Sequence, residues 1–221
     1  MNIASYIDHT ILKPTTSPED IKTICDEAKA YGFAAVCIPP PFVRNALHLL
    51  KDSEVKIATV AGFPFGYSIA RAKLVEVQQA MEDGADELDV VVNLTALKNK
   101  SWLYLESEIK LLTEAVHQKG RIIKVIIETG ILDDKEIIRC CEIYAKAGID
   151  FMKTSTGYAE KGATIEAVQL MRQHLPSDIS IKASGGIRTY EFAKKLVAAG
   201  ADRLGCSAGI SIVKQQILKD E

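Results

Sequence analysis

The chain has 221 residues, 48% of them hydrophobic and 25% charged, and is long enough to bury one sizeable core. Its formal net charge of −2 comes from acidic and basic residues scattered along the whole chain, without the basic stripe that nucleic acid or an anionic membrane would require. No apolar run approaches the roughly 20 residues that span a bilayer. We therefore expect one domain over residues 1–221 with a small-molecule partner, and neither a nucleic-acid nor a membrane partner.

The cysteines and histidines indicate a reduced protein without a metal site. The five cysteines are an odd number with no C-x-x-C pair, and the N-terminus has neither the cationic nor the apolar region of a secretion signal. The histidines lie far apart and show no H-E-x-x-H spacing. They are His9, His48, His117 and His174. We expect a cytoplasmic protein with no metal ligands.

One pattern recurs along the chain, in which an amphipathic helix ends at a glycine and an apolar strand follows. The five segments read AYGFAAVCI, EDGADELDVV, QKGRIIKVII, KAGIDFMKTS and AAGADRLGCS. Glycine tolerates the left-handed conformation that commonly ends a helix, so each of these glycines is expected to be a C-cap. They are Gly32, Gly84, Gly120, Gly148 and Gly200.

In chain order, the pattern predicts eight strands with helices between them. Helix starts are expected at Ser17-Pro18-Glu19-Asp20 and Asp133-Asp134, where cap-forming and acidic residues suit a first turn. Eight strand–helix units in about 220 residues favour a single α/β domain, a closed (β/α)8 TIM barrel. An open doubly wound sheet is the alternative, but no G-x-G-x-x-G follows the first strand. The expected strands lie near 7–12, 33–38, 55–61, 87–93, 122–129, 150–155, 179–184 and 203–207.

Three neighbouring strands of this barrel each carry one lysine among core-forming residues: Lys124 in IIKVIIET, Lys153 in DFMKTSTG and Lys182 in SIKASGGI. A single strand lysine more often reaches water or pairs with a carboxylate. Three on adjacent strands favour a shared site, because alternate strand residues face the lumen. Crowding and loss of solvation both lower a lysine pKa. A neutral amine can then form a Schiff base with a carbonyl compound.

Strand four supplies a carboxylate to the same interior. In ADELDVVVN, alternation puts Asp89 on the inner face, whereas Asp86 and Glu87 are expected in the solvated turn before the strand. Asp89 can bond a lysine or pass protons through water; a structural ion pair is the alternative. Asp8 in YIDHTIL is a second candidate for an inward carboxylate, and the opposite parity of His9 indicates a structural histidine.

The loops after strands seven and eight carry small residues suited to phosphate, which such barrels often bind there with backbone amides and a helix N-terminus. SGGIRT offers Gly185 and Gly186, and GCSAGIS offers Ser207 before an expected short final helix. Ordinary turn formation is the alternative explanation of these residues. The loop STGYAEKGA adds Gly157 and Lys161 as further candidate anion contacts.

With these residues assembled, the chain resembles the deoxyribose-phosphate aldolase family of class I aldolases. The resemblance runs over nearly the whole chain, through IDHTILKP, VAGFPFG, ELDVVVN, KVIIETG, DFMKTSTG and KASGGIRT. It implies reversible cleavage of 2-deoxy-D-ribose 5-phosphate to acetaldehyde and D-glyceraldehyde 3-phosphate, a reaction of deoxyribonucleotide catabolism that needs no cofactor. The expected partners are these sugar-phosphate and aldehyde substrates, and we expect a homo-oligomer, with the dimer as the expected state.

The resemblance also implies a role for each candidate. Lys153 forms the Schiff base, Lys182 lies beside it and lowers the pKa of that amine, and Asp89 joins Lys182 in a proton relay. The polar lumen is completed by Lys124 and Asp8, with Cys37 of VCIPP near the substrate, and the phosphate falls to Gly185, Gly186 and Ser207.

One departure from the family and two other interpretations remain. Some members end in a tyrosine that reaches the active site, whereas this chain ends in VKQQILKDE, so the resemblance implies no tail-assisted proton transfer. A different phosphate-binding barrel enzyme is one alternative, either another Schiff-base aldolase or a sugar-phosphate isomerase that uses Glu128 as its base and does not need Lys153. A barrel that has lost its chemistry and only binds ligands is the other.

Overall fold

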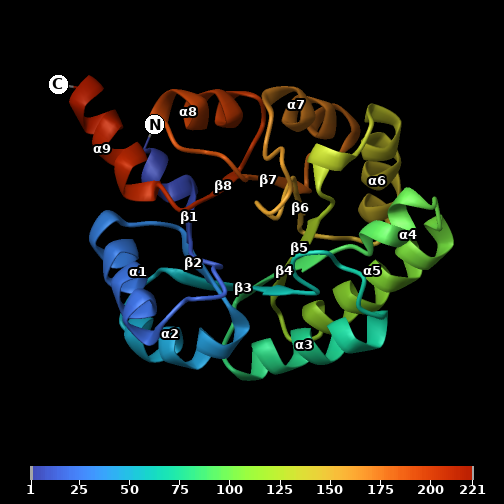
Figure 1. Ribbon diagram of the computed structural model, residues 1–221, viewed down its shortest axis with the longest axis horizontal. Helices are drawn as coiled ribbons and strands as arrows, with labels where there is room; N and C mark the ends of the chain where they lie inside the picture. Colours follow the sequence, from blue (N-terminus) through green and yellow to red (C-terminus); the bar gives the residue numbers. More distant parts are fainter. Residues whose placement is uncertain (1, 221) are drawn as a thin grey trace.

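Eight parallel strands close into a barrel in the computed structural model, which describes residues 2–220 (Figure 1). Each strand pairs with the next, and β8 pairs with β1. The predicted (β/α)8 barrel is confirmed and the open sheet is wrong. The strands are β1 Ile7–Thr10, β2 Ala35–Ile38, β3 Lys56–Ala61, β4 Glu87–Val91, β5 Ile122–Ile126, β6 Phe151–Lys153, β7 Ser180–Ser184 and β8 Arg203–Cys206.

Several expected strands extend too far at their C-terminal ends. The expected strand 122–129 stops at Ile126, because Glu128 adopts a left-handed conformation with φ of 57° and starts a turn. The expected strand 87–93 stops at Val91, because Asn93 caps the next helix through its side chain. The residues that leave the ladder at these ends form the loops around the mouth of the barrel.

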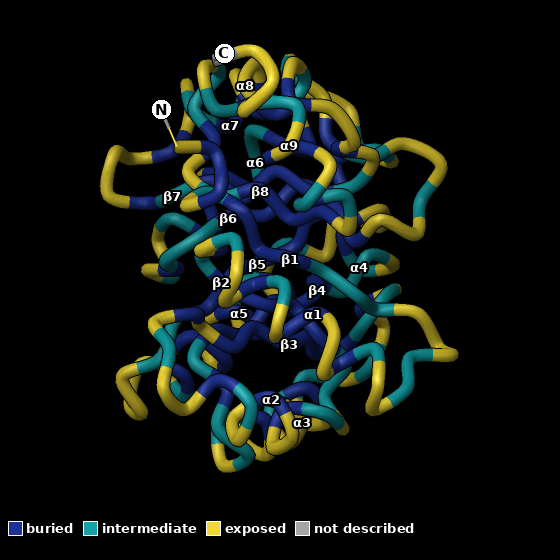
Figure 2. The backbone as a smooth tube through the Cα atoms, turned by 90° about the vertical axis from the view of Figure 1, so that its left-hand side faces the viewer, coloured by how far each residue is buried: buried dark blue, intermediate teal, exposed yellow. Residues whose placement is uncertain are grey.

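Helices surround the barrel, so the strands at the centre are buried and the outer helix faces and loops are exposed (Figure 2). The helices are α1 Pro18–Tyr31, α2 Val43–Leu50, α3 Ala70–Glu82, α4 Leu94–Lys98, α5 Trp102–His117, α6 Asp134–Lys146, α7 Ile165–His174, α8 Tyr190–Ala198 and α9 Gly209–Asp220. Three 3-10 turns, η1 Ile3–Tyr6, η2 Pro40–Phe42 and η3 Thr129–Ile131, complete the described elements. Within the described residues, no helix combines the length and the apolar character needed to cross a membrane.

Both predicted helix starts are confirmed. Ser17 and Asp20 form a capping box at the start of α1, and Asp133 and Glu136 form one at the start of α6, which satisfies backbone N–H groups that lack helical partners. Gly32 is the left-handed C-cap of α1, as expected. The other four glycines also have positive φ but lie one or two residues beyond the assigned caps. The final helix α9, expected to be short, has 12 residues.

The barrel interior divides into an apolar part and a charged part. On β2 and β3, the inward residues are small, and they form their own cluster of Ala35, Cys37, Ala58 and Val60. The other strands direct long charged side chains into the space that these small residues leave, and Lys124 and Lys182 are among the largest fully buried side chains described. The interior is therefore filled, as in other barrels of this kind, but with ion-paired groups on most of its strands.

Candidate active site

Asp89 accepts hydrogen bonds from all three predicted lysines. The Nζ atoms of Lys153 and Lys182 lie 2.8 and 2.7 Å from Asp89 Oδ2, and Lys124 Nζ lies 3.0 Å from Oδ1. Strand register explains the meeting, because Asp89 lies opposite Lys124 on β5 and Lys153 lies opposite Lys182 on β7. All four side chains are buried. The structure thus brings together the four residues that the alternation argument placed in the barrel interior.

Two further carboxylates and an arginine complete the buried cluster. Asp8 faces inward from β1, as expected, and its Oδ2 lies 2.5 Å from Lys182 Nζ. The prediction that Glu87 lies in a solvated turn is wrong: Glu87 begins β4, is 2% exposed and pairs with Lys124 and Arg203. Glu87 has the same parity as Asp89, so alternation directs both carboxylates inward. Arg203 was not predicted, although its outward neighbour Leu204 in β8 gives the same signal.

The lowering of pKa expected from crowding does not hold for Lys124 and Lys182. Burial lowers the pKa of Lys182, but the carboxylates of Asp8 and Asp89 outweigh burial and hold this pKa above its usual value. The pKa of Lys124 is raised in the same way, against burial, by Asp89 and Glu87. Both raised pKa values favour the charged form of Lys124 and Lys182. The prediction counted the ammonium groups but not all of the carboxylates between them.

Asp89 remains ionised in spite of its burial. Burial alone would raise its pKa, but Lys124, Lys153 and Lys182 together hold that pKa well below its usual value. An ionised Asp89 holds the three amines in place by hydrogen bonds and can accept a hydrogen bond from a water that carries protons to and from a ligand.

A cavity of about 520 Å³ opens at the C-terminal end of the barrel, and Lys153 lies in its wall. The other members of the buried cluster do not line this cavity. Lys153 is the last residue of β6, so its side chain lies at the mouth, where barrel enzymes hold their substrates. Of the three lysines, Lys153 is the one that a ligand in the cavity can reach.

The predicted phosphate-binding residues surround the same cavity. Gly157, Gly185, Gly186 and Ser207 all line it. The three glycines have φ of 90°, 88° and 76°, a range that side-chain-bearing residues rarely adopt. A Cβ on Gly162 would lie 2.3 Å from the carbonyl oxygen of Gly185, so glycine is needed where the β6–α7 and β7–α8 loops pack together.

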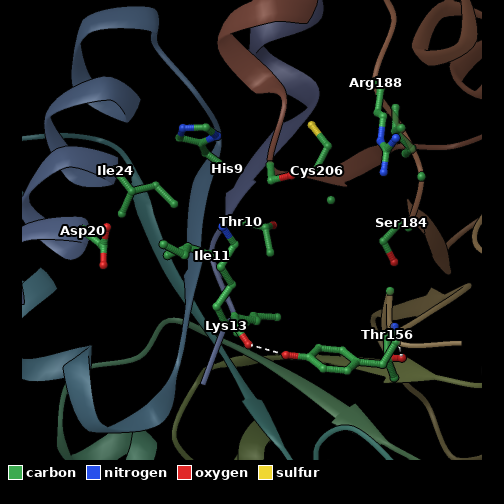
Figure 3. A pocket seen from close by; sticks show the side chains of 18 of the residues that line it. His9, Thr10, Ile11, Lys13, Asp20, Ile24, Thr156, Ser184, Arg188 and Cys206 are labelled. Carbon is green, nitrogen blue, oxygen red and sulfur yellow. Dashed lines mark hydrogen bonds between the residues drawn. The ribbon is translucent and has the colours of Figure 1, made fainter. Parts of the chain in front are cut away.

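Two cations at the cavity were not predicted. Arg188 and Lys13 both line it, and Figure 3 shows Arg188 and Ser184 on one side of the cavity with Lys13 and Asp20 toward the other. Both cations stand inside motifs already singled out, Arg188 in SGGIRT and Lys13 in IDHTILKP. Their signal was their position in loops after strands. Lys161, the expected anion contact, is exposed and does not line the cavity.

Two further candidates, Cys37 and His9, each contact a carboxylate. Cys37 is fully buried with its Sγ 3.9 Å from Asp89 Oδ2 and does not line the cavity, and its expected position near the substrate stays a prediction. Its position on β2 places the thiol in the apolar part of the interior, and burial raises its pKa. His9 pairs through its Nε2 with Glu27 Oε2 at 2.7 Å, which suits the structural histidine expected, and it also lines the cavity.

Glu128, the base required by the isomerase alternative, is bonded to another residue. It is 3% exposed, accepts hydrogen bonds from the backbone N–H and the hydroxyl of Thr156, and does not line the cavity. Burial raises its pKa. Glu128 fixes the start of the β6–α7 loop through these bonds, so its geometry gives the isomerase alternative no support.

The fold and the site together define the class of protein: a (β/α)8 barrel with a buried cluster of amines and carboxylates beneath a cavity at the C-terminal end of its strands. The comparisons with known proteins agree with this class. The family model described as DeoC/LacD family aldolase matches residues 2–216, and the chain belongs to this family.

Relatives and solved structures extend the similarity over nearly the whole chain. The deoxyribose-phosphate aldolase of Caldanaerobacter subterraneus subsp. tengcongensis is 50% identical over 216 residues, 97% of this chain and 94% of that protein. A putative deoxyribose-phosphate aldolase from Coccidioides immitis superposes with a TM-score of 0.94 at 42% identity, covering 98% of this chain and 86% of that one. The tetrameric deoxyribose phosphate aldolase from Aeropyrum pernix superposes with a TM-score of 0.91 at 34% identity, covering 97% and 91% of the two chains.

Proposed function

We propose that this chain is a deoxyribose-phosphate aldolase, which reversibly cleaves 2-deoxy-D-ribose 5-phosphate to acetaldehyde and D-glyceraldehyde 3-phosphate through a Schiff base on Lys153. The observation that carries the proposal is the position of Lys153, which lines the cavity while its Nζ lies 2.8 Å from Asp89 Oδ2. Imine chemistry requires an amine with access to the substrate and a group that moves protons to and from the reacting atoms, and Lys153 and Asp89 fit these two roles.

In the cleavage direction, the neutral amine of Lys153 attacks the C1 aldehyde of the open-chain sugar, and loss of water leaves a protonated imine. A water held by Asp89 and Lys182 takes the proton of the C3 hydroxyl as the C2–C3 bond breaks. The electron pair of that bond moves into the imine, which becomes an enamine, and D-glyceraldehyde 3-phosphate leaves. Return of a proton to the enamine carbon and hydrolysis then release acetaldehyde and free Lys153.

The protonated imine is the electron sink, so the proposed reaction uses no metal or organic cofactor. The phosphate end of the substrate would lie against the loops of Gly185, Gly186 and Ser207, with Gly157 and the cationic Arg188 nearby. A phosphate fixed there sets the distance between the tail of the substrate and C1, so binding energy away from the reacting bond positions that bond.

We propose a homo-oligomer, with the dimer as the first state to test. Support comes from apolar side chains that are exposed on the single chain: Phe65 and Tyr67, stacked on each other, and Leu103, 82% exposed. The Aeropyrum pernix relative is a tetramer. Light scattering during size-exclusion chromatography measures the state directly, and a monomer would contradict the proposal. A cytoplasmic location fits the five unpaired, buried cysteines.

The decisive test is to trap the imine. The protein is incubated with acetaldehyde, reduced with borohydride, and digested for peptide mass spectrometry. We expect one stable adduct, on Lys153, and we expect Lys153→Ala to lose both adduct and retro-aldol turnover while its near-UV circular dichroism is kept. Lys161→Ala, which removes an exposed lysine from the following loop, is the matched control and should keep both. An adduct on another lysine, or turnover in Lys153→Ala, would contradict the assignment.

A further inference from the structure

Arg203 joins two carboxylates across the N-terminal end of the barrel, opposite the end where Lys153 meets the cavity. Its Nε donates to Asp8 Oδ1 at 2.6 Å, and its two terminal nitrogens lie 3.3 and 3.2 Å from the two carboxylate oxygens of Glu87. The side chain is 14% exposed. This forked contact suits a guanidinium, which stays charged at every working pH.

The buried charges of the barrel form one connected group, which we call the lumen ion network. Its members are Asp8, Glu87, Asp89, Lys124, Lys153, Lys182 and Arg203. Within this network, four cations therefore face three carboxylates. One of the four cations is therefore expected to lose its proton, because an unbalanced charge is costly in a buried site.

Of the four cations, Lys153 has the fewest ion-pair partners and so loses its proton most easily. Lys124, Lys182 and Arg203 each contact at least two of the three carboxylates. Among described residues, Lys153 pairs with Asp89 alone, through the oxygen that Lys182 also contacts. A neutral Lys153 leaves three cations facing three carboxylates. Without Arg203, the same balance would instead be reached with Lys153 charged.

We infer that Arg203, opposed by Glu87, is a positioning residue whose fixed charge makes Lys153 the surplus cation of the lumen ion network and so keeps its amine free to attack a carbonyl. The inference rests on the proposed Schiff-base function. Arg203 and Glu87 would act on Lys153 through their charge alone, because neither lines the cavity or contacts Lys153. The pKa of Arg203 is consistent with a fixed charge, because Asp8 and Glu87 raise it more than burial lowers it.

The other groups around Lys153 are the same in the wild-type protein and in the Arg203 and Glu87 variants. Cys37 faces Asp89 from β2, and burial raises the pKa of its thiol. Glu128, in the loop after β5, is a further carboxylate that interacts with Lys153; it lies outside the lumen ion network, is hydrogen-bonded to Thr156, and burial raises its pKa. The inward residues of β3 are apolar. None of these groups changes in the variants below, so any shift in pH dependence reports on Arg203 and Glu87.

The experiment measures borohydride trapping of acetaldehyde on Lys153 as a function of pH in Arg203→Met, Glu87→Gln and the double variant. We expect the pH of half-maximal trapping to rise by about one unit in Arg203→Met, which corresponds to removing one charge roughly 12 Å away at an effective dielectric constant of about 20. It should fall by a similar amount in Glu87→Gln, which enlarges the positive surplus. The double variant should return close to the wild-type value, and Arg203→Lys should keep it.

These variants are expected to fold. In Arg203→Met, Asp8 keeps Lys182 as a partner and Glu87 keeps Lys124, so no carboxylate is left alone. The matched control is Arg121→Met. Arg121 pairs with Asp86, the residue before β4, and the Arg121 side chain is 36% exposed. Its trapping profile should not move.

Each outcome supports or overturns the inference. An unmoved midpoint in folded Arg203→Met overturns it, and so does a shift of the same size in Arg121→Met. If Arg203→Met does not fold, Glu87→Gln decides, because a midpoint that fails to fall refutes the charge balance. If wild-type protein forms no adduct on Lys153, the proposed function fails first, and that result is distinct from an adduct whose pH dependence ignores Arg203.

Discussion

Replacing Lys182 with methionine should cause a loss of activity that high pH reverses. Lys182 keeps a fixed positive charge next to Lys153, and this charge opposes protonation of the Lys153 amine. Removing it makes the protonated form of Lys153 easier to maintain, so a higher pH is needed to expose the nucleophile. Asp8 and Asp89 keep other cationic partners in the variant, so the fold should survive.

The geometry gives the size of the effect. The two Nζ atoms lie 2.8 and 2.7 Å from the same oxygen of Asp89, so they are at most about 5.5 Å apart. Two unit charges at this distance interact by about 3 kcal/mol at an effective dielectric constant of 20, which corresponds to about 2 pH units. No reduction for solvent screening applies, because neither side chain is more than 3% exposed. At pH 7, kcat/KM should fall by about 100-fold.

The assay is the pH profile of imine trapping, measured beside the pH profile of retro-aldol turnover. Lys182→Met should move the trapping midpoint upward by about 2 units, whereas Lys182→Arg, which keeps the charge, should move it little. A folded Lys182→Met protein with an unchanged trapping midpoint would refute the electrostatic reasoning. A lower turnover with that unchanged midpoint would instead limit Lys182 to proton transfer after the imine has formed.

Three further predictions test other parts of the site. Ser207→Asp should raise KM for deoxyribose 5-phosphate by about tenfold, from roughly 1.4 kcal/mol of charge repulsion, and should leave free deoxyribose unaffected; equal losses for both sugars would argue against the phosphate loops. Glu128→Gln should keep more than about a tenth of turnover, since its amide oxygen can still accept from Thr156, whereas a loss of 100-fold or more would indicate a catalytic base. Folding lowers the pKa of both Asp8 and Asp89. Their ionised forms therefore stabilise the fold fully above the ordinary pKa near 3.8, and this stabilisation is lost as pH falls below that value. The melting temperature, measured by circular dichroism, should decrease steeply only below about pH 4.

Local sequence determined the elements of this protein and the faces of its strands. Helix starts at Ser17 and Asp133 and the helix end at Gly32 follow from capping chemistry that acts within a few residues, so they were predicted correctly. Alternation along a strand also acts locally, and it placed Asp89 and Lys124 in the barrel interior. The error at Glu87 came from giving its acidic character more weight than its parity with Asp89.

Only the tertiary structure decided which charges meet and in what proportion. Asp8 pairs with Arg203, 195 residues away, because closure of the barrel puts β1 beside β8. Asp89 and Lys182, 93 residues apart, meet because both point into one narrow lumen. The pKa of Lys182 depends on the sum of the charges around it, to which Asp8 contributes more than any other single charged group. Alternation predicts that a side chain points inward, but the balance of four cations and three carboxylates in the lumen ion network exists only once eight strands have closed.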